Sequence, residues 1–423
     1  MHLLLLLIIF VLAFTSNEHE ATADASVDYF PPYSSIVVPV TKHTDASKPL
    51  YSVQIMTQWL SDYEQHMYTN FLIDIDAPFI WHDCIVQGNM NPGRCPANTV
   101  CTYPVSCDED QCTNIRTTYS YEDPSCSPET NTTLPGVVCG CPVNVVNPVT
   151  GTCGQGLLSF EELYVNVSDG RNPLIGIYGF YPHGAACVPS SSLASFPANV
   201  SGVMAFSTSP YAAPSLLYQP LEKTLALCLP SNSSAQGVLF FGTGPYYLLP
   251  QTGVDLSSYL VYTPLLKHPD SFGYYIGVDS IVIKKRSIGI PANTTTKLST
   301  TDPYTILRSD IYNSVVRRFL IVTKRIPPAK PVAPFGLCFS TKDGKKWTIS
   351  TSNSIKQITK DVACLAFVDG GATSEPAVVI GTFQFEDNFL VFDLKKSTFG
   401  FSSSLLSKKT SCSNFNFTRT NTP

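Results

Sequence analysis

Two similar segments, one early and one late in the chain, limit most strongly how this sequence can fold. The first is FLIDIDAPFIW at residues 71–81, and the second is TKLSTTDPYTIL at residues 296–307. Each has an apolar approach, a short polar turn and an apolar exit, which is typical of two strands joined by a turn. Further along, VSGVMAF at residues 200–206 and AVVIGTF at residues 377–383 each place a glycine beside an apolar run. The repeat predicts two lobes built on one plan.

The composition is that of a folded, strand-rich protein. Only 14% of the 423 residues are charged and 44% are hydrophobic, and the chain contains 33 prolines and 25 glycines. Short apolar runs separated by Pro, Gly, Asn and Ser recur along it, as expected for strands and turns. The clearest helical pattern covers residues 309–320, and Ser309 or Asp310 is expected to cap its first turn. We therefore predict an all-β fold with few helices.

The amino-terminal residues have the pattern of a secretory signal. The run LLLLLIIFVLAF at residues 3–14 is too short to span a bilayer and suits the core of a signal peptide. We expect residues 1–25 to form this signal, with cleavage between about Thr15 and Ala25. The formal net charge of −5, without a basic block, offers no binding surface to nucleic acid or an anionic membrane. The mature protein is expected to be secreted, with neither as a partner.

The cysteines and the glycosylation sequons agree with secretion. Fourteen cysteines form an even set, and ten of them lie between Cys84 and Cys187. They lack the two separated ligand pairs of a zinc site, so we expect disulfides, no metal and no cofactor. The pairing within this cluster stays open. Candidate glycosylation sites on surface loops are Asn131, Asn166, Asn199, Asn232, Asn293 and Asn416.

Two lobes that each carry a polar turn above a hydrophobic–glycine strand are the architecture of pepsin-like aspartic proteases. In that fold each lobe supplies one aspartate, and the two carboxylates share a proton and activate a water molecule. Asp74 ends the first approach strand, and Ser299 takes the corresponding place in the second lobe. We predict a bilobal pepsin-like fold, with an amino-terminal β lobe at residues 26–215 and a carboxy-terminal β lobe at residues 216–423.

The two turns lack the groups that proteolysis needs. Ile75 and Asp76 stand where a small hydroxyl and a glycine would follow the aspartate. A serine does not titrate near neutrality, so Ser299 cannot share a proton with Asp74. Asp302 starts up to about 10 Å from Ser299 along an extended chain and is interpreted as a turn residue. We interpret Asp74 and Ser299 as vestigial and predict that the protein is not an enzyme.

Longer motifs add a family resemblance that runs from about Val37 to Phe417. They are STTDPYTIL, PVAPFGLCFST, CLAFVDGG, VVIGTFQFEDNFLVFDL and the ending SCSNFNFT. With these the sequence resembles the plant xylanase-inhibitor-like glycoproteins, which include endoxylanase inhibitors, xyloglucan-endoglucanase inhibitors, extracellular dermal glycoproteins and 7S basic globulins. The resemblance implies a disulfide-rich, catalytically inactive, aspartic-protease-like protein of the apoplast or cell wall. It also implies the disulfides Cys338–Cys364 and Cys228–Cys412.

The resemblance further implies inhibition of microbial glycoside hydrolases by a monomer, as part of plant defence. Such enzymes carry two carboxylates in an open cleft, which a basic side chain on a rigid loop can enter. Family position indicates Lys409, three residues before the last cysteine, with Lys408 beside it. The proline-rich loop VTKRIPPAKPVAP offers Arg325 and Lys330 as further contacts. The pattern favours xyloglucan endoglucanases over xylanases as targets.

Two other functions stay open at this stage. One is an active aspartic endopeptidase, which Ser299 argues against. The other is a wall- or seed-associated binding or storage glycoprotein. The sequence also departs from the family, because only eight residues separate Cys338 from Trp347. Either a sheet of the second lobe is one strand short, or an exon edge is missing from the sequence.

Overall fold

The structure is a computed structural model, and it describes residues 33–418 except for 60–61, 88–95, 97–98, 119–125, 127–131, 135–136, 183, 218–220, 222, 252, 293 and 342–352. The predicted signal peptide and two sequons, Asn131 and Asn293, lie outside the described residues. So does most of the short segment between Cys338 and Trp347. Among the helices that are described, none is long and apolar enough to cross a membrane.

Four strands position the first polar turn. β3 (Asp62–Asp74) enters the turn, and β4 (Trp81–Asp83) leaves it. β14 (Val200–Ala205) runs parallel to β3 and antiparallel to β4. β13 (Ala185–Val188) then pairs parallel with β4. Gly202 allows this close approach, because a Cβ there would lie 2.4 Å from a carbonyl oxygen of β4.

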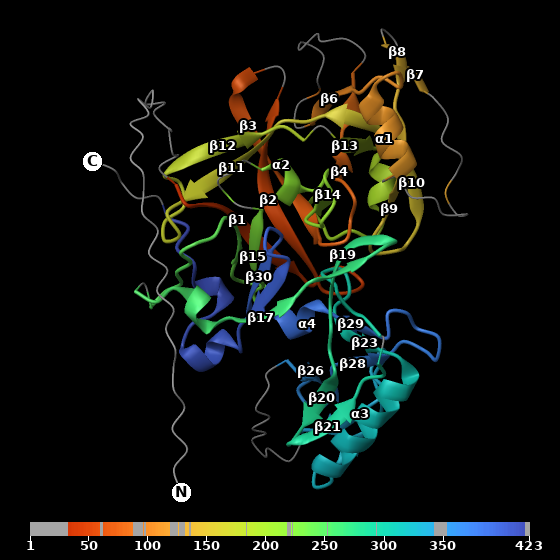
Figure 1. Cartoon of the computed structure of the whole chain (residues 1–423), viewed down its shortest axis with the longest axis vertical. Helices are drawn as coiled ribbons and strands as arrows, with labels where there is room; N and C mark the ends of the chain where they lie inside the picture. The colour runs from red at the N-terminus through yellow and green to blue at the C-terminus, as the bar shows by residue number, and fades with distance from the viewer. Residues whose placement is uncertain are drawn as a thin grey trace, which may run out of the picture. The chain divides into compact units, whose positions relative to one another are not determined.

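The second polar turn is built in the same way. β22 (Thr296–Leu298) enters it and β23 (Thr305–Leu307) leaves it. β29 (Val378–Ile380) is parallel to β22 and antiparallel to β23, and β28 (Phe367–Asp369) is parallel to β23. Figure 1 labels three strands of this second group, β23, β28 and β29. The strand pairing of the first turn is repeated, which confirms the repeat predicted from the sequence.

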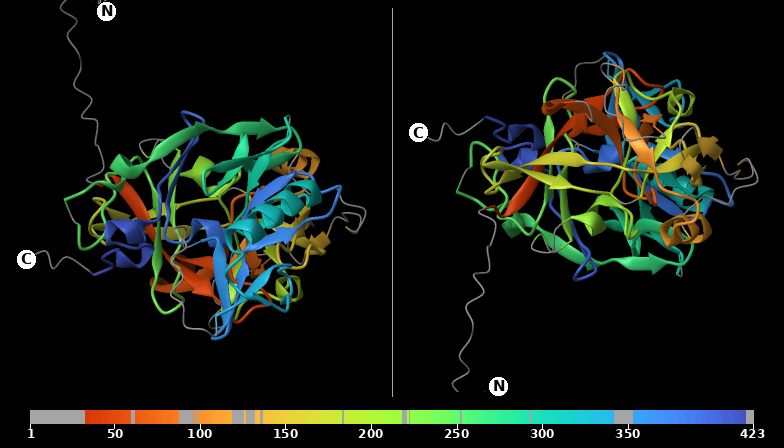
Figure 2. Two further views of the ribbon diagram at one scale, coloured as in Figure 1. Left: turned by 90° about the horizontal axis from the view of Figure 1, so that it is seen from below. Right: turned by 90° about the horizontal axis from the view of Figure 1, so that it is seen from above.

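A chain of antiparallel pairs joins strands from both halves of the sequence. β1 pairs with β16, followed in turn by β15, β30, β31 and β17. Blue strands from the end of the chain therefore lie beside green strands from its middle (Figure 2). The bounds are β1 (Ser35–His43), β15 (Thr224–Cys228), β16 (Gly237–Phe241), β17 (Val261–Pro264), β30 (Phe389–Asp393) and β31 (Thr398–Phe401).

The other strands of the first lobe extend this framework. β2 (Leu50–Trp59) pairs with β3, and β11 (Leu163–Ser168) pairs with β2 and with β12 (Gly176–Phe180). β9 (Pro142–Val146) and β10 (Cys153–Phe160) form a hairpin. The shorter elements are β5 (Ile85–Val86), β6 (Cys101–Pro104), α1 (Asp110–Thr118), β7 (Thr132–Leu134), β8 (Val137–Gly140), the 3-10 helix η2 (Ser190–Leu193) and α2 (Ala213–Leu216).

The second lobe contains the longest helix of the described residues, α3 (Ser309–Val322), which buries the apolar face predicted from the sequence. The predicted cap is wrong, because the N-cap residue is Arg308 and no side chain caps the helix. The side chains of Ser309 and Asp310 are engaged elsewhere. The hydroxyl of Ser309 donates to Asp369, and the carboxylate of Asp310 pairs with Arg308.

The remaining elements complete the second lobe and the carboxy-terminal end. They are η4 (Leu256–Tyr259), β18 (Leu266–His268), β19 (Ser271–Ile276), β20 (Ser280–Ile283), β21 (Arg286–Gly289), β24 (Pro328–Ala329), β25 (Cys338–Ser340), β26 (Ile355–Thr359), β27 (Val362–Leu365), α4 (Thr382–Phe385), η5 (Leu405–Lys408) and η6 (Cys412–Asn414).

Disulfides fasten both lobes. The six within the described residues are Cys84–Cys187, Cys107–Cys139, Cys112–Cys141, Cys126–Cys153, Cys228–Cys412 and Cys338–Cys364. The last two are the pairs implied by the family resemblance. The fold is strand-dominated and bilobal, as predicted. Calling it all-β leaves out α1 to α4 and the 3-10 helices.

Candidate functional site

Asp74 occupies the floor of the first polar turn. One of its oxygens, Oδ1, accepts the backbone N–H groups of Asp76 at 2.8 Å and Ala77 at 3.2 Å. Only 9% of the residue is exposed. Burial, followed by the nearby charge of Asp76, raises the pKa of Asp74 to about 6, against the opposing effects of the backbone N–H bonds and Lys297. The carboxyl group therefore changes charge in mildly acidic solution.

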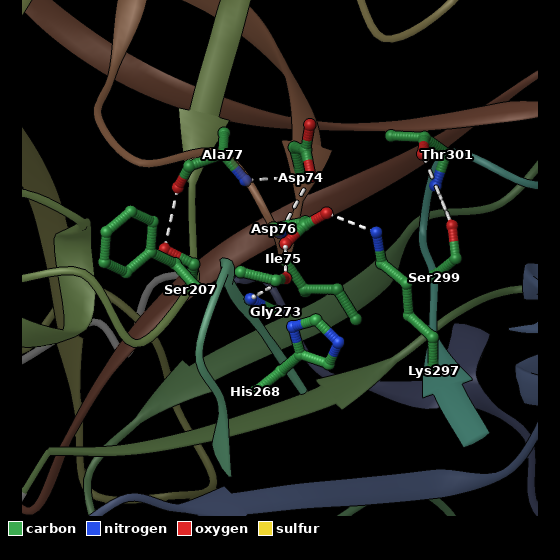
Figure 3. A network of polar contacts seen from close by, with 12 residues as sticks. Asp74, Ile75, Asp76, Ala77, Ser207, His268, Gly273, Lys297, Ser299 and Thr301 are labelled. Atoms are coloured by element: carbon green, nitrogen blue, oxygen red, sulfur yellow. Dashed lines mark hydrogen bonds and ion pairs between the residues drawn. The ribbon is translucent and has the colours of Figure 1, made fainter. Parts of the chain in front are cut away.

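The two turns are joined directly by Thr300. Its hydroxyl donates to the carbonyl oxygen of Ile73 at 2.7 Å and accepts the N–H of Ile75 at 3.3 Å. Ile75 is 1% exposed and packs in a hydrophobic core cluster that includes both Leu72 and Leu298. The second turn thus donates a hydroxyl hydrogen bond to the first turn. Ile75 has no hydroxyl with which to form the reciprocal bond. This places the turns of Asp74 and Ser299 side by side (Figure 3).

Asp76 ties the first turn to the second lobe. Its Oδ2 pairs with the ammonium group of Lys297 on β22, and its Oδ1 accepts the hydroxyl of Ser271 on β19 at 2.7 Å. Figure 3 shows the Lys297 side chain reaching Asp76 across the site. Gly273 makes room for this contact, because a Cβ there would lie 2.6 Å from Asp76 Oδ1. The charged residue at this position therefore serves as a link between lobes.

Ser299 is engaged within its own turn. Its hydroxyl donates to Asp302 Oδ2 at 2.9 Å and accepts the N–H groups of Asp302 at 3.1 Å and Thr301 at 3.3 Å. Asp302 is a turn residue, as predicted, but the turn folds back and brings its carboxylate into contact with Ser299. The Ser-x-x-Asp spacing is the signal that could have indicated this, because a serine and an acidic residue three apart bond reciprocally in tight turns.

Lys48 is a further charged residue that the sequence analysis missed. It is half-buried, and its ammonium group donates to the carbonyl oxygen of Pro148, at the tip of the β9–β10 hairpin, at 3.4 Å. Burial lowers the pKa of Lys48, while the carboxylates of Asp302 and Asp74 oppose that shift. No local pattern around Lys48 indicates this position. It depends on long-range packing of the chain.

The arrangement around Asp74 does not provide a catalytic pair of carboxylates. The residue in the corresponding place of the second turn is Ser299, whose hydroxyl remains neutral near neutrality. The charge that raises the pKa of Asp74 comes from Asp76, and Lys297 already compensates Asp76. Nothing in these contacts sets up the shared proton of an aspartic protease.

Asp74 also gives the fold a specific pH dependence, which can be measured. Its pKa is about 6 in the folded protein and near 4 when unfolded, so the folded state binds more protons between these values. Stability from this group is present below about pH 4 and is lost as pH rises through 6. By urea unfolding, Asp74→Asn should gain about 3 kcal/mol relative to wild type between pH 3.5 and 7.5. A difference that does not vary with pH would contradict this.

The predicted basic contacts lie on two separate parts of the molecule. Lys409 is exposed and has a left-handed backbone, with φ of 60°, at the end of η5. Lys408 places its ammonium group 5.0 Å from the ring centre of Tyr259. Arg325 and Lys330 are exposed near β24. Among the described residues no contact joins these two pairs, so we treat them as separate surfaces.

The sequons differ in their surroundings. Asn199 and Asn232 are exposed in loops, as expected for glycosylation sites. Asn166 instead lies inside β11, paired on both sides, and its side-chain oxygen is enclosed. The expectation of a surface loop is therefore wrong for Asn166. Asn416 is half-buried, and its amide donates to Asn172 at 3.4 Å.

One cluster has the residue types of a metal site. Ligand atoms of His82, Cys84 and Glu161 lie within 4.8 Å of one another. However, Cys84 is bonded to Cys187, and His82 Nε2 lies 3.1 Å from a carboxylate oxygen of Glu161. Burial lowers the pKa of His82, but Glu161 and the backbone of Asp83 outweigh this and raise it overall. The cluster is an ion pair beside a disulfide.

Comparison with known proteins agrees with this geometry. Family models described as xylanase inhibitor N-terminal and xylanase inhibitor C-terminal match residues 60–243 and 273–403. Gamma conglutin 1 of Prunus dulcis is 35% identical over 376 residues, which cover 82% of this chain and 83% of the relative. The probable aspartic proteinase GIP2 of Nicotiana benthamiana is 30% identical, with 94% of each chain covered.

A solved structure shares the fold over nearly the whole chain. The crystal structure of EDGP superimposes with a TM-score of 0.74 at 30% identity, covering 92% of this chain and 99% of that one. The family models match more than half of the sequence, and both lobes are included. The chain therefore belongs to the xylanase-inhibitor-like family of inactive, aspartic-protease-like proteins.

Proposed function

We propose that this protein is a secreted, non-catalytic inhibitor of microbial glycoside hydrolases that degrade plant cell walls. In this proposal Ser299 stands where the second catalytic aspartate of the ancestral fold stood, and the apoplast or cell wall is the site of action. The partner is a glycoside hydrolase, bound by a monomer. The family models described as xylanase inhibitor support the class of partner.

The observation that carries the proposal is a rigid basic surface around Lys409. Thr410, the next residue, donates its hydroxyl to the carbonyl oxygen of Leu249 at 2.6 Å. Cys412 follows, held by its disulfide to Cys228. Lys409 itself has no side-chain partner among the described residues. An exposed ammonium group is thus presented by a backbone that loses little freedom on binding.

A second loop supports the same surface. Gln251 donates to the carbonyl oxygen of Lys408 at 2.6 Å and accepts the hydroxyl of Tyr259 at 3.1 Å. Lys408 lies over the ring of Tyr259, which fixes its charge at the edge of the surface. Leu406 and Leu249 are 51% and 44% exposed. Protein interfaces that exclude water from a charged contact often surround the cation with apolar side chains, as here.

The chemistry of the partner fits this surface. A glycoside hydrolase cleft contains two carboxylates separated by a few ångströms, and both are exposed to an entering cation. An ammonium group between them forms charge-assisted hydrogen bonds that substrate sugar cannot displace easily. Of the possible targets, a xyloglucan-type endoglucanase is our proposal, from the position of Lys409. Arg325 and Lys330 are proposed as a second, weaker contact, since both are exposed and uncompensated among the described residues.

The test is inhibition of a panel of secreted fungal glycosidases by the purified protein. We expect inhibition of at least one xyloglucan endoglucanase, competitive with substrate. A second candidate, a wall- or seed-associated binding or storage glycoprotein, is favoured by the likeness to gamma conglutin 1. Absence of inhibition across endoglucanases, xyloglucanases and xylanases would replace the first candidate by the second.

The proposal also predicts that proteolysis is absent. Purified protein should not digest denatured casein between about pH 3 and 5, where a pair of carboxylates works. Ser299→Asp alone should not create activity, because the new carboxylate would meet Asp302, and Asp76 would still hold Lys297. Cleavage by the unmodified protein that a transition-state inhibitor of aspartic proteases blocks would contradict the inactive assignment and favour the endopeptidase alternative.

A further inference from the structure

The outer face of four strands carries a row of side chains that the proposed inhibitor function does not use. β3, β2, β11 and β12 pair in this order, and residues directly opposite one another share a face of the sheet (Figure 1). The register places Tyr68 opposite Met56, Met56 opposite Tyr164, and Tyr164 opposite Gly179. One line of residues therefore crosses all four strands.

Large side chains on this face are open to solvent. Tyr68 is 55% exposed and Ile177, two residues before Gly179 on β12, is 55% exposed. Tyr181, just beyond β12, is 56% exposed. Met56 is 4% exposed, although its neighbour Ile55 is the one that packs in the core. Met56 is therefore covered from the outer side, where the flanking residues Tyr68 and Tyr164 stand.

The ring of Tyr164 is held in place. The hydroxyl of Tyr164 donates to the carboxylate of Glu162. The ring of Tyr164 fills the space above Gly179, where an added Cβ would lie 3.0 Å from a ring carbon. Because this ring is already oriented, a ligand that stacks on it does not have to order it.

The charges on the face limit what it can bind. None of the described positions on its four strands holds a lysine or an arginine, from Gln54 and Asn70 through Asn166 to Tyr181. The carboxylate of Glu162 on this face accepts the hydroxyl of Tyr164. These strands therefore offer no cationic side chain to a polyanion. Aromatic rings bordered by amides and phenol hydroxyls suit a neutral ligand with apolar faces and many hydroxyls.

We propose that this surface, the tyrosine face, binds neutral β-linked glycan chains such as those of plant cell walls. It is formed by Tyr68, Tyr164, Ile177, Tyr181 and Glu162. Sugar rings stack their C–H faces on the tyrosines, while their hydroxyls bond the phenols and neighbouring amides. Tyr68 and Tyr164 are two strand spacings apart, about 10 Å, so the face spans more than one sugar unit. Binding would hold the protein on its wall without engaging Lys409.

The test measures binding of cellohexaose to the purified full chain by isothermal titration calorimetry, with an oligogalacturonate as the acidic comparison. We expect cellohexaose to bind and the oligogalacturonate not to bind. Tyr68→Ala and Tyr181→Ala should each weaken binding about tenfold, the effect of one lost stacking contact. Tyr262→Ala is the matched control, because Tyr262 is 52% exposed but lies on β17.

Other outcomes would overturn the proposal. These are no binding by the wild type, equal binding by the Tyr68 and Tyr181 variants, or a preference for the acidic chain. Sedimentation velocity gives a further arm. A dimer that both variants abolish would assign the face to a second copy of the chain. Glycosidase inhibition should be unchanged in all three variants, so failure of the glycan proposal is distinguishable from failure of the inhibitor proposal.

Discussion

Lys409→Glu is expected to weaken inhibition of a xyloglucan endoglucanase by about 30-fold or more. The substitution puts a carboxylate where the enzyme cleft already holds two, so attraction becomes repulsion in a partly desolvated site. Loss of such a charged contact costs about 2 to 5 kcal/mol of binding free energy. The measurement is the inhibition constant at fixed ionic strength, with the melting temperature of each variant as the check on folding.

Two further substitutions at this position separate charge from backbone effects. Lys409→Arg keeps the charge and should retain inhibition, because its planar fork can engage a carboxylate through two hydrogen bonds. Lys409→Gly removes the charge and suits the left-handed backbone, so it should lose inhibition without losing stability. A stable glycine variant that still inhibits would show that the ammonium group is not the contact.

The chain offers a matched control. Lys285 is also an exposed lysine with a positive φ, 63°, but it lies in the turn between β20 and β21. Lys285→Glu makes the same change in net charge as Lys409→Glu, and it should leave inhibition unchanged. Arg325→Glu tests the second proposed contact. If Lys285→Glu and Lys409→Glu weakened inhibition equally, long-range repulsion would explain the loss and Lys409 would leave the proposed site.

The repeat allowed the framework of the fold to be predicted from sequence. Apolar approach, polar turn and apolar exit are local patterns, and a later hydrophobic–glycine strand has little choice of partner in each lobe. The paired turns of Asp74 and Ser299 follow from that pattern, whereas the contact that Thr300 makes between them was not predicted. The helix over residues 309–320 was likewise visible, because its apolar face repeats at helical spacing.

The side-chain contacts of the site were less accessible from sequence. Asp302 was placed too far from Ser299, since an extended path overestimates distance in a turn that folds back. The position of Lys48 near Asp74 could not be predicted from the sequence, because it depends on packing between segments far apart in the chain. Asn166 begins a valid sequon but lies within a sheet, and the three-residue sequon pattern carries no information about that sheet.

The contacts of Asp76 explain why a charged residue is tolerated in a turn where glycine was expected. Its side chain leaves the crowded centre and pairs with Lys297 and Ser271 of the other lobe. The turn therefore carries a link between lobes at the position where a glycine was expected. The rigidity that results from such a link suits a protein that presents a fixed surface to a binding partner.

The largest effect on stability is expected at a second link, the buried ion pair of Lys42 and Glu386. The ammonium group of Lys42 lies 2.7 Å from Glu386 Oε1, and the two side chains are only 4% and 8% exposed. Lys42 also donates to the carbonyl oxygen of Ser231 at 2.8 Å, and Tyr51 donates to the same Glu386 oxygen at 2.8 Å. Strand β1 is thereby joined to the end of α4.

Lys42→Met should lower the free energy of unfolding by about 3 to 5 kcal/mol at pH 7, because it leaves the carboxylate of Glu386 buried and uncompensated. Burial already raises the pKa of Glu386 with Lys42 present, so the loss should shrink in acid as this carboxyl becomes protonated. The double variant Lys42→Met with Glu386→Gln should recover most of the stability, since no charge is left unpaired. Urea unfolding with the disulfides intact measures all three. If Lys42→Met cost no more than an exposed substitution such as Lys285→Met, the pair would not be a link between β1 and α4.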